Sequence, residues 1–261
     1  MEQTALAATL EMKDQVGVIT MRHAPHNLLG GALTEAILSC LEQARGNGAR
    51  ALLLRSGLRH FSAGADPAVL STAAASGTRT LSVSPTQFLA QFEACPLPIV
   101  AAVHGVCVGG GFELALACDF ILAARSAKIG SVEVTIGINP LMGGIQRQAQ
   151  RAGALRAKEM SMLGHRYDAE TLERWNLINR VVDDDKLDDA AMAVTQELAH
   201  GPTLAHGITK QLAAIAVNQG VAAADAAMQE LQKPMWASED VKIGMASLMT
   251  NGPGLAKFVG R

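Results

Sequence analysis

Residues 98–118 decide how this chain folds, and they read Pro-Ile-Val-Ala-Ala-Val-His-Gly-Val-Cys-Val-Gly-Gly-Gly-Phe-Glu-Leu-Ala-Leu-Ala-Cys. The first seven are almost wholly apolar, which predicts a strand buried on both faces. The glycines 109–111 follow, and the apolar spacing after them predicts a helix. Backbone N–H groups at such a helix start can bind a phosphate or stabilise an oxyanion, although a close strand–helix contact also explains three glycines.

Strands and helices alternate on both sides of this stretch. Strands are expected at residues 4–13 and 16–21 (a hairpin), 50–55, 98–104, 120–123 and 179–182. Helices are expected at residues 31–46, 85–93, 109–117, 143–153, 154–163 and 168–175. Residues 67–83 are small and polar and are expected to form a mobile surface loop. After residue 183 every strong pattern is helical, so the sequence predicts an α/β core followed by a helical C-terminal part.

Composition argues against several classes of partner. The 261 residues carry a formal net charge of −2 and show no basic stripe, so nucleic acid is not expected as a partner. The longest apolar stretch, residues 97–112, contains proline, histidine and four glycines, and it is too short and broken to span a membrane. The N-terminus has no basic region, so neither a secretory signal nor a transit peptide is expected. The four cysteines show no metal-binding spacing, which favours reduced, buried thiols and a cytoplasmic location.

Two carboxylates are placed where acid–base chemistry could use them. Glu113 lies just after the glycines, where it serves either as a first-turn carboxylate favoured by the helix dipole or as a catalytic group. Glu133 lies in the apolar stretch Gly-Ser-Val-Glu-Val, so it either occupies a surface turn or has a raised pKa and a chemical task. A pair of carboxylates beside backbone donors suits proton transfer at an activated carbonyl.

Other motifs give no match. The glycine spacing does not fit a dinucleotide fingerprint or a phosphate-binding loop with Gly-Lys-Ser/Thr, and no serine lies in a Gly-x-Ser-x-Gly elbow. The acidic run at residues 183–185 is interpreted as a helix start, so no metal site is expected.

Four segments, in order, resemble the crotonase superfamily of enoyl-CoA hydratases and isomerases. They are Phe-Ser-Ala-Gly-Ala-Asp (61–66), the stretch from Pro98 to Ala115, Gly-Ser-Val-Glu-Val to Gly-Gly-Ile-Gln-Arg (130–147), and Ser-Glu-Asp-Val-Lys-Ile-Gly-Met (238–245). The resemblance implies an oxyanion hole for a thioester carbonyl, formed by the N–H groups of Ala65 and Gly110. It implies that Glu113 and Glu133 are the two catalytic glutamates. It implies a substrate path that includes Ala63, Asp66, Pro67, Ala68, Gly109 and Leu141.

The same resemblance implies the architecture. It predicts repeated ββα turns that form two sheets in a catalytic core (residues 1–200), followed by a helical region (residues 201–261) that drives assembly into a homotrimer, or into a hexamer built as a dimer of trimers. No metal and no cofactor are expected, since coenzyme A is part of the substrate. Leu141 departs from the small residue common in hydratases and is expected to narrow the pocket.

The leading hypothesis is an enoyl-CoA hydratase that adds water across the C2–C3 double bond of a 2-enoyl-CoA. Three alternatives stay open: an isomerase or acyl-CoA decarboxylase with the same oxyanion hole, a binder of CoA thioesters without turnover, and an RNA-binding member of the fold. The pair of glutamates counts against the isomerase, and the balanced charge counts against RNA.

Overall fold

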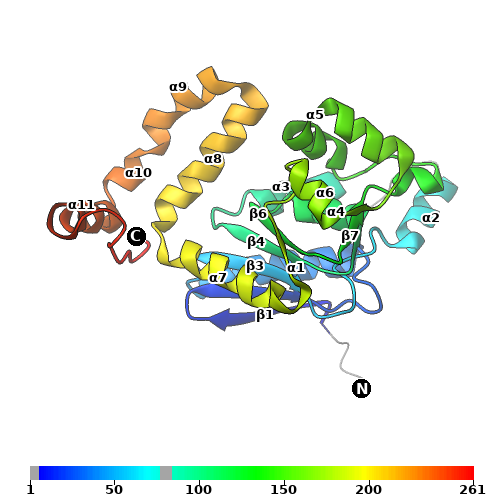
Figure 1. The fold of residues 1–261 in the computed structure, drawn as a ribbon, viewed down its shortest axis with the longest axis horizontal. Helices are drawn as coiled ribbons and strands as arrows, with labels where there is room; N and C mark the ends of the chain where they lie inside the picture. Colours follow the sequence, from blue (N-terminus) through cyan, green and yellow to red (C-terminus); the bar gives the residue numbers. More distant parts are fainter. Residues whose placement is uncertain (1–5, 77–83) are drawn as a thin grey trace.

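The computed structural model describes residues 6–76 and 84–261 and is built on two sheets (Figure 1). The larger sheet has six strands in the spatial order β1-β2-β3-β4-β6-β9: Ala8–Lys13, Val16–Met21, Ala51–Ser56, Ile99–Val103, Phe120–Ala124 and Arg180–Val182. The smaller sheet has three strands in the order β5-β7-β8: Val106–Val108, Lys128–Gly130 and Tyr167–Asp168. The mixed α/β architecture confirms the predicted fold class.

Only the first pair of the larger sheet is antiparallel. β1 and β2 form the expected hairpin, with Ala8 opposite Met21 and Lys13 opposite Val16. From β2 onward every neighbouring pair in this sheet is parallel. Parallel strands covered on both faces are continuously apolar, and all five residues of β4 are indeed buried.

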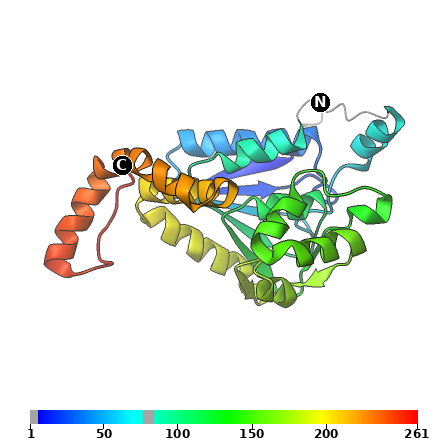
Figure 2. The same cartoon turned by 90° about the horizontal axis from the view of Figure 1, so that it is seen from above.

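Helices cover both faces of the larger sheet. Figure 2 shows α1 and α7 on opposite sides of it. The α-helices are α1 Gly31–Gly46, α2 Pro67–Ser76, α3 Pro85–Glu93, α4 Gly110–Leu116, α5 Gly144–Leu163, α6 Ala169–Arg174, α7 Leu187–His200, α8 Thr203–Gln219, α9 Val221–Leu231, α10 Lys233–Trp236 and α11 Glu239–Asn251. Two short 3₁₀ helices, η1 Glu133–Ile136 and η2 Asp184–Lys186, precede α5 and α7. In both views α8 to α11 form an arm that extends away from the sheets.

Several local expectations are confirmed. The helix over residues 143–163 is broken at Gly153, whose φ of 81° and ψ of 160° are not helical. Asp168 caps α6 by accepting a hydrogen bond from the Thr171 N–H, and Ser238 caps α11 in the same way. The four cysteines are free and buried.

The prediction of a loop over residues 67–83 is wrong for the first ten of them, which form helix α2. Pro67 stands in the first turn, where its missing N–H costs nothing, and the Asp66 carboxylate accepts the Ala68 N–H at 2.9 Å. Alanine-rich sequence then favours helix over loop. Residues 77–83 lie outside the described part of the chain.

Candidate active site

The glycine triplet links strand β5 of the smaller sheet to helix α4. β5 leads into Gly109, whose N–H donates to the Gly130 carbonyl at the end of β7 at 3.0 Å. Gly109 has φ +55° and ψ −131°, a conformation open mainly to glycine. A Cβ at this position would stand 3.4 Å from Glu133 Oε1. The glycine is therefore required by the turn and also leaves room for the Glu133 carboxylate.

The N–H groups of Ala65 and Gly110 lie next to each other. Leu29 donates to the Gly64 carbonyl at 2.8 Å and accepts from Asp66 N–H at 3.0 Å. Because successive N–H groups of an extended chain point to opposite sides, the Ala65 N–H faces away from Leu29. A Cβ on Gly110 would stand 3.6 Å from the Ala65 nitrogen. In the described part of the chain neither N–H has an acceptor, as is usual for Gly110 at a helix start. Two free donors side by side can stabilise an oxyanion.

Ser62 fixes the position of these two backbone segments. Its hydroxyl donates to the Asn27 carbonyl at 2.7 Å and accepts the Gly64 N–H at 3.2 Å. A Cβ on Gly111 would stand 2.6 Å from Ser62 Cβ, so only glycine lets α4 pack this closely. Each glycine of the triplet therefore has its own role: Gly109 makes the turn, Gly110 leaves its N–H next to that of Ala65, and Gly111 lets α4 pack against Ser62.

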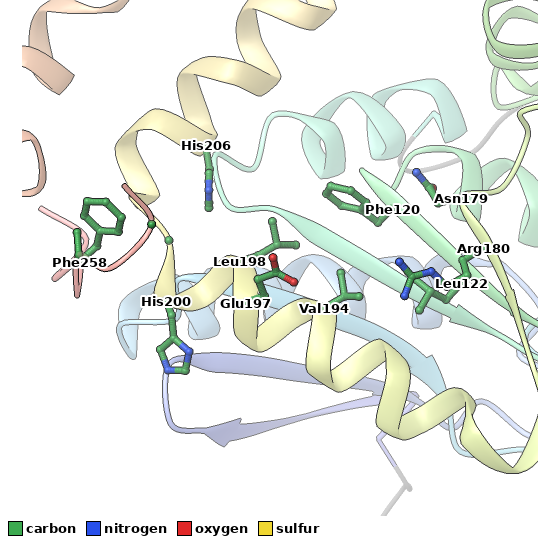
Figure 3. A pocket seen from close by; sticks show the side chains of 13 residues that line it. Phe120, Leu122, Asn179, Arg180, Val194, Glu197, Leu198, His200, His206 and Phe258 are labelled. Atoms are coloured by element: carbon green, nitrogen blue, oxygen red, sulfur yellow. The ribbon is translucent and has the colours of Figure 1, made fainter. Parts of the chain in front are cut away.

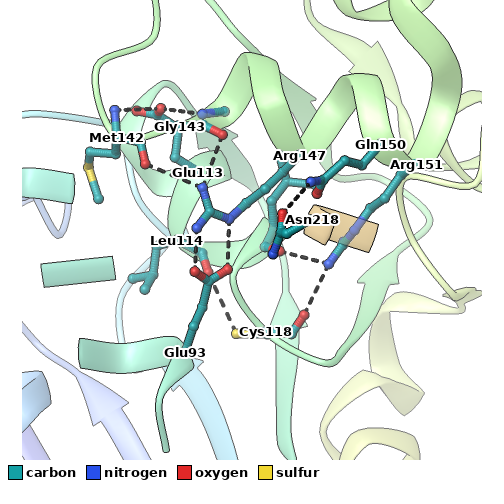
Figure 4. A network of polar contacts seen from close by, with 12 residues as sticks. Glu93, Glu113, Leu114, Cys118, Met142, Gly143, Arg147, Gln150, Arg151 and Asn218 are labelled. Atoms are coloured by element: carbon teal, nitrogen blue, oxygen red, sulfur yellow. Dashed lines mark hydrogen bonds and ion pairs between the residues drawn. The ribbon is translucent and has the colours of Figure 1, made fainter. Parts of the chain in front are cut away.

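Glu113 is held by the backbone of a distant turn. It lies in the first turn of α4, is buried, and its Oε1 accepts hydrogen bonds from the N–H groups of Met142 and Gly144, both at 2.7 Å (Figure 4). Burial raises the pKa of Glu113, and these N–H groups together with the Arg147 charge oppose that rise. Glu113 is therefore a first-turn carboxylate that also has partners outside its own helix.

Glu133 has the opposite environment. It begins η1 directly after β7, it is 8% exposed, and neither carboxylate oxygen has a hydrogen-bond partner among the described residues. Burial, and after it the negative charge of Glu113, raises the pKa of Glu133 to about 7, against the opposing influence of the backbone N–H groups of Glu133 and Val132. Of the two environments expected for this residue, the structure shows the buried one. A carboxyl group with this pKa can give and take a proton near neutral pH.

Four of the residues expected on a substrate path, Ala63, Asp66, Pro67 and Ala68, lie just before α2 or in its first turn. Ala63 N–H donates to the His26 carbonyl at 3.0 Å, and Asp66, Pro67 and Ala68 form the start of the helix. The Asp66 carboxylate is engaged there by the Ala68 N–H. These residues therefore lie close to the Ala65 N–H because they are its neighbours in the sequence.

Met142 belongs to the site and was not predicted. Its side chain is buried, and its Sδ would stand 3.3 Å from a Cβ on Gly110. The Leu29 side chain would lie 3.1 Å from the same point. Met142 therefore borders Gly110 and follows Leu141, the residue expected to narrow the pocket. In the sequence, the only indications that Met142 lies near Gly110 are its long side chain and its position next to Leu141.

A separate cavity of about 860 Å³ is lined by none of these groups and lies between β6, β9, α7 and the C-terminal residues (Figure 3). Its polar lining includes Glu197, His200 and His206, next to Phe120 and Phe258. Over residues 6–76 and 84–261, no group of three or more His, Cys, Asp or Glu side chains is placed to hold a metal ion, and no helix is long and apolar enough to cross a membrane.

Comparison with known proteins agrees with the motifs. The model of the enoyl-CoA hydratase/isomerase family matches residues 11–253. A "probable enoyl-CoA hydratase" of Rhizobium meliloti (strain 1021) is 32% identical over 247 residues, 92% of this chain and 93% of that protein. A carnitinyl-CoA dehydratase of Citrobacter koseri is 38% identical over 164 residues, 62% of each chain.

Solved structures agree as well. A probable enoyl-CoA hydratase/isomerase from Mycobacterium abscessus superposes with a TM-score of 0.86 at 27% identity, over 98% of this chain and 99% of that one. Subunit I of an enoyl-CoA hydratase from Geobacillus kaustophilus HTA426 gives a TM-score of 0.88 at 29% identity, over 98% of each chain. With the family model matched from residue 11 to residue 253, the chain belongs to the enoyl-CoA hydratase/isomerase family, within the crotonase superfamily.

Proposed function

We propose that the protein is an enoyl-CoA hydratase, which adds water to a 2-enoyl-CoA to give a 3-hydroxyacyl-CoA. The observation that carries the proposal is the pair of buried carboxylates beside two free N–H groups: one accepts two N–H bonds, and the other has no hydrogen-bond partner among the described residues. A hydration needs a group that takes a proton from water and a group that delivers one to carbon. The two glutamates supply both.

In this proposal the N–H groups of Ala65 and Gly110 bind the thioester oxygen. Glu113 takes a proton from the water whose oxygen adds at C3, and negative charge moves through the double bond onto the thioester oxygen as an enolate. Glu133 then delivers its proton to C2, and the proton taken up by Glu113 passes through solvent to Glu133 before the next turnover. Loss of one oxyanion donor typically costs about 10²–10³ in rate, so two donors account for a large part of the acceleration. The step consumes water alone, so no cofactor beyond the coenzyme A of the substrate is proposed.

The test is loss of the conjugated-enoyl absorbance on incubation with crotonyl-CoA and longer 2-enoyl-CoAs. Wild-type protein should consume at least one chain length, and Glu113→Gln and Glu133→Gln should each lose several orders of magnitude in kcat. Lack of turnover over the whole series would contradict the proposal. A structure with acetoacetyl-CoA would show how much room Leu141 and Met142 leave for the acyl chain and the water.

Three related activities are distinguished by assays with other acyl-CoA substrates and with the same variants. The carnitinyl-CoA dehydratase among the relatives suggests the reverse direction, which would appear as formation of enoyl absorbance from a 3-hydroxyacyl-CoA. An isomerase would turn over a 3-enoyl-CoA even as the Glu113→Gln variant, and a decarboxylase would release CO₂ from a carboxyacyl-CoA. Tight binding of every acyl-CoA without turnover would identify a non-catalytic binder.

We further propose that the protein assembles as a homotrimer, or as a hexamer of two trimers, through residues 201–261. The support is the set of exposed apolar side chains on the arm, among which Trp236 is 62% and Met249 is 85% exposed. Exposed apolar side chains gathered on one part of a molecule are typical of an interface. Sedimentation velocity should give three or six times 27.3 kDa, and a monomer would contradict this part. The free, buried cysteines fit a proposed cytoplasmic location.

A further inference from the structure

The turn that holds Glu113 has two sides. On one side the N–H groups of Met142 and Gly144 point to the Glu113 carboxylate. On the other side its carbonyl groups need their own partners, because a buried carbonyl without one costs free energy. Gly143, in the middle, has a φ of +100° and permits this sharp reversal.

Arg147 supplies those partners. Its Nη1 donates to the Gly143 carbonyl at 3.1 Å and contacts the Met142 carbonyl at 3.5 Å (Figure 4). Its backbone N–H donates to the same Gly143 carbonyl at 3.3 Å. A Cβ on Gly143 would stand 2.4 Å from Nη1, so the guanidinium lies directly against the turn.

Glu93 fixes Arg147 in turn. The guanidinium Nε donates to Glu93 Oε1 at 2.7 Å, and Nη2 pairs with Oε2, so the contact is a two-point fork. Glu93 is the last residue of α3, whereas Arg147 is on α5. A bidentate Arg–carboxylate pair restricts the guanidinium far more than a single contact does.

We infer that Arg147 is a positioning residue for Glu113, acting through the 142–144 turn and itself oriented by Glu93. What Glu113 does for the reaction rests on the proposed function; how it is held does not. Arg147 does not touch the substrate in this role. It sets the orientation of the two N–H groups that aim the Glu113 carboxylate, as outer residues do for metal ligands.

The charges around Glu113 give the inference a second readout. The Glu113 carboxylate is faced by Glu133 from η1 and by the Arg147 cation from α5. Arg147 is faced by Glu93 and by Arg151. Because a nearby cation favours the carboxylate form, removal of the Arg147 charge should raise the pKa of Glu113 further. The acidic limb of kcat/KM, where Glu113 takes up a proton, should then move to higher pH.

The test compares Arg147→Gln, Arg147→Lys and Glu93→Gln with the control Arg156→Gln. Arg156 is on the same helix, pairs with Glu159 and does not contact the turn. We expect Arg147→Gln to lower kcat by about 10²-fold with little change in KM, as a small misplacement of a catalytic group does. Lysine keeps the charge without the fork, so Arg147→Lys should keep the acidic limb in place and leave kcat low. Glu93→Gln should give an intermediate loss, and Arg156→Gln none.

Hydrogen exchange of the peptide that contains Met142 and Gly144, followed by mass spectrometry, tests the same inference without turnover. Exchange should be faster in Arg147→Gln than in wild type and unchanged in Arg156→Gln. If the wild-type protein hydrates no enoyl-CoA, the proposed function fails, and the exchange result still decides the role of Arg147. If Arg147→Gln matches Arg156→Gln in kcat, pH profile and exchange, the inference is wrong. If Arg147→Gln does not fold, Arg147→Lys and Glu93→Gln decide by the same measurements.

Discussion

Glu133 Oε1 lies so close to Gly109 that a Cβ there would be 3.4 Å away, and the carboxylate has no hydrogen-bond partner within the described residues. The backbone of Gly109, which has no side chain, forms one side of the space around the Glu133 carboxyl group. That side ends at Gly110, whose N–H is one of the two free donors. In the proposed hydratase, the position of Glu133 relative to the enolate is therefore set by the glycine turn that also carries this donor.

Gly109→Ala should damage the site and the fold together. The added Cβ would come into van der Waals contact with the Glu133 carboxylate, and φ +55° costs a non-glycine residue about 1–2 kcal/mol. We expect a kcat at least about tenfold lower and a lower unfolding midpoint. The control is Gly46→Ala at the end of α1, where a Cβ meets nothing within 4 Å and should be neutral or slightly stabilising. Equal activity of the two variants would contradict the role given to Gly109.

The pKa of Glu133, about 7, predicts the pH dependence of hydration. Proton delivery to C2 needs the neutral acid, so kcat/KM for crotonyl-CoA should fall as pH rises through about 7. Conversely, Glu133→Gln should show low activity that does not follow this limb. A wild-type rate that is constant from pH 6 to pH 9 would contradict the assignment of Glu133 as the acid.

The same group should make stability depend on pH. The folded-state pKa of Glu133 is above its ordinary value of 4.5, so its contribution is complete below about pH 4.5 and is lost as pH rises through about 7. At pH 8 the buried charge costs on the order of 3 kcal/mol, from about 1.4 kcal/mol for each unit of pKa. Glu133→Gln should therefore unfold at higher urea concentration than wild type at pH 8, and the difference should narrow toward pH 5. A variant that is less stable at pH 8 would show that Glu133 has a favourable partner.

Sequence patterns predicted the parts of the site whose residue type is required by chemistry or by backbone geometry. Glu113 and Glu133 stood out because carboxylates are rare in apolar stretches, and the glycines stood out because only they allow close backbone approach. The contacts of Met142, Arg147 and Glu93 could not be predicted. They depend on a turn that meets α4 from another part of the chain, and no local periodicity encodes that meeting.

The strands and helices also divide into those that the sequence predicts and those that it does not. β4 was predicted because five buried residues in a row leave an unbroken apolar run. β5 and β7 were missed because three residues are too few to show alternation, and the two-residue β8 shows none. α2 was taken for a loop because alanine, serine and threonine carry no apolar stripe, although Pro67 and Asp66 are helix-start signals.

Met142 should influence which acyl chains are accepted. Its side chain is buried beside Gly110, while its bond to Glu113 uses only the backbone N–H. Met142→Ala should keep that bond, open space beside the oxyanion donors and shift kcat/KM toward longer or branched 2-enoyl-CoAs. It should also cost about 2–4 kcal/mol of stability, as truncation of buried methionine does. Met162→Ala on α5, where Met162 is 67% exposed, should change neither property. An unchanged chain-length profile in Met142→Ala would remove this residue from the pocket wall.

The C-terminal residues should hold the helical arm to the core through Asp240. This buried carboxylate accepts the N–H of Val259 at 2.7 Å and of Gly260 at 3.0 Å, while the Arg50 guanidinium, beside the start of β3, donates to the Phe258 carbonyl at 3.0 Å. Burial lowers the pKa of Arg50, and the negative charge of Asp240 opposes this lowering. The Asp240 charge therefore favours the charged form of Arg50.

Asp240→Asn removes that charge at nearly constant size and should lower stability by about 1.5–3 kcal/mol, the range for hydrogen bonds to charged groups. Hydrogen exchange should become faster in α11 and residues 256–261 and stay slow in β4, since the site and the sheet do not depend on this contact. Glu239→Gln is the matched control, because Glu239 is exposed at the same helix start and its ion pair among the described residues is with the exposed Arg261. Loss of protection in β4 as well as α11 would show that the arm and the core unfold as one unit.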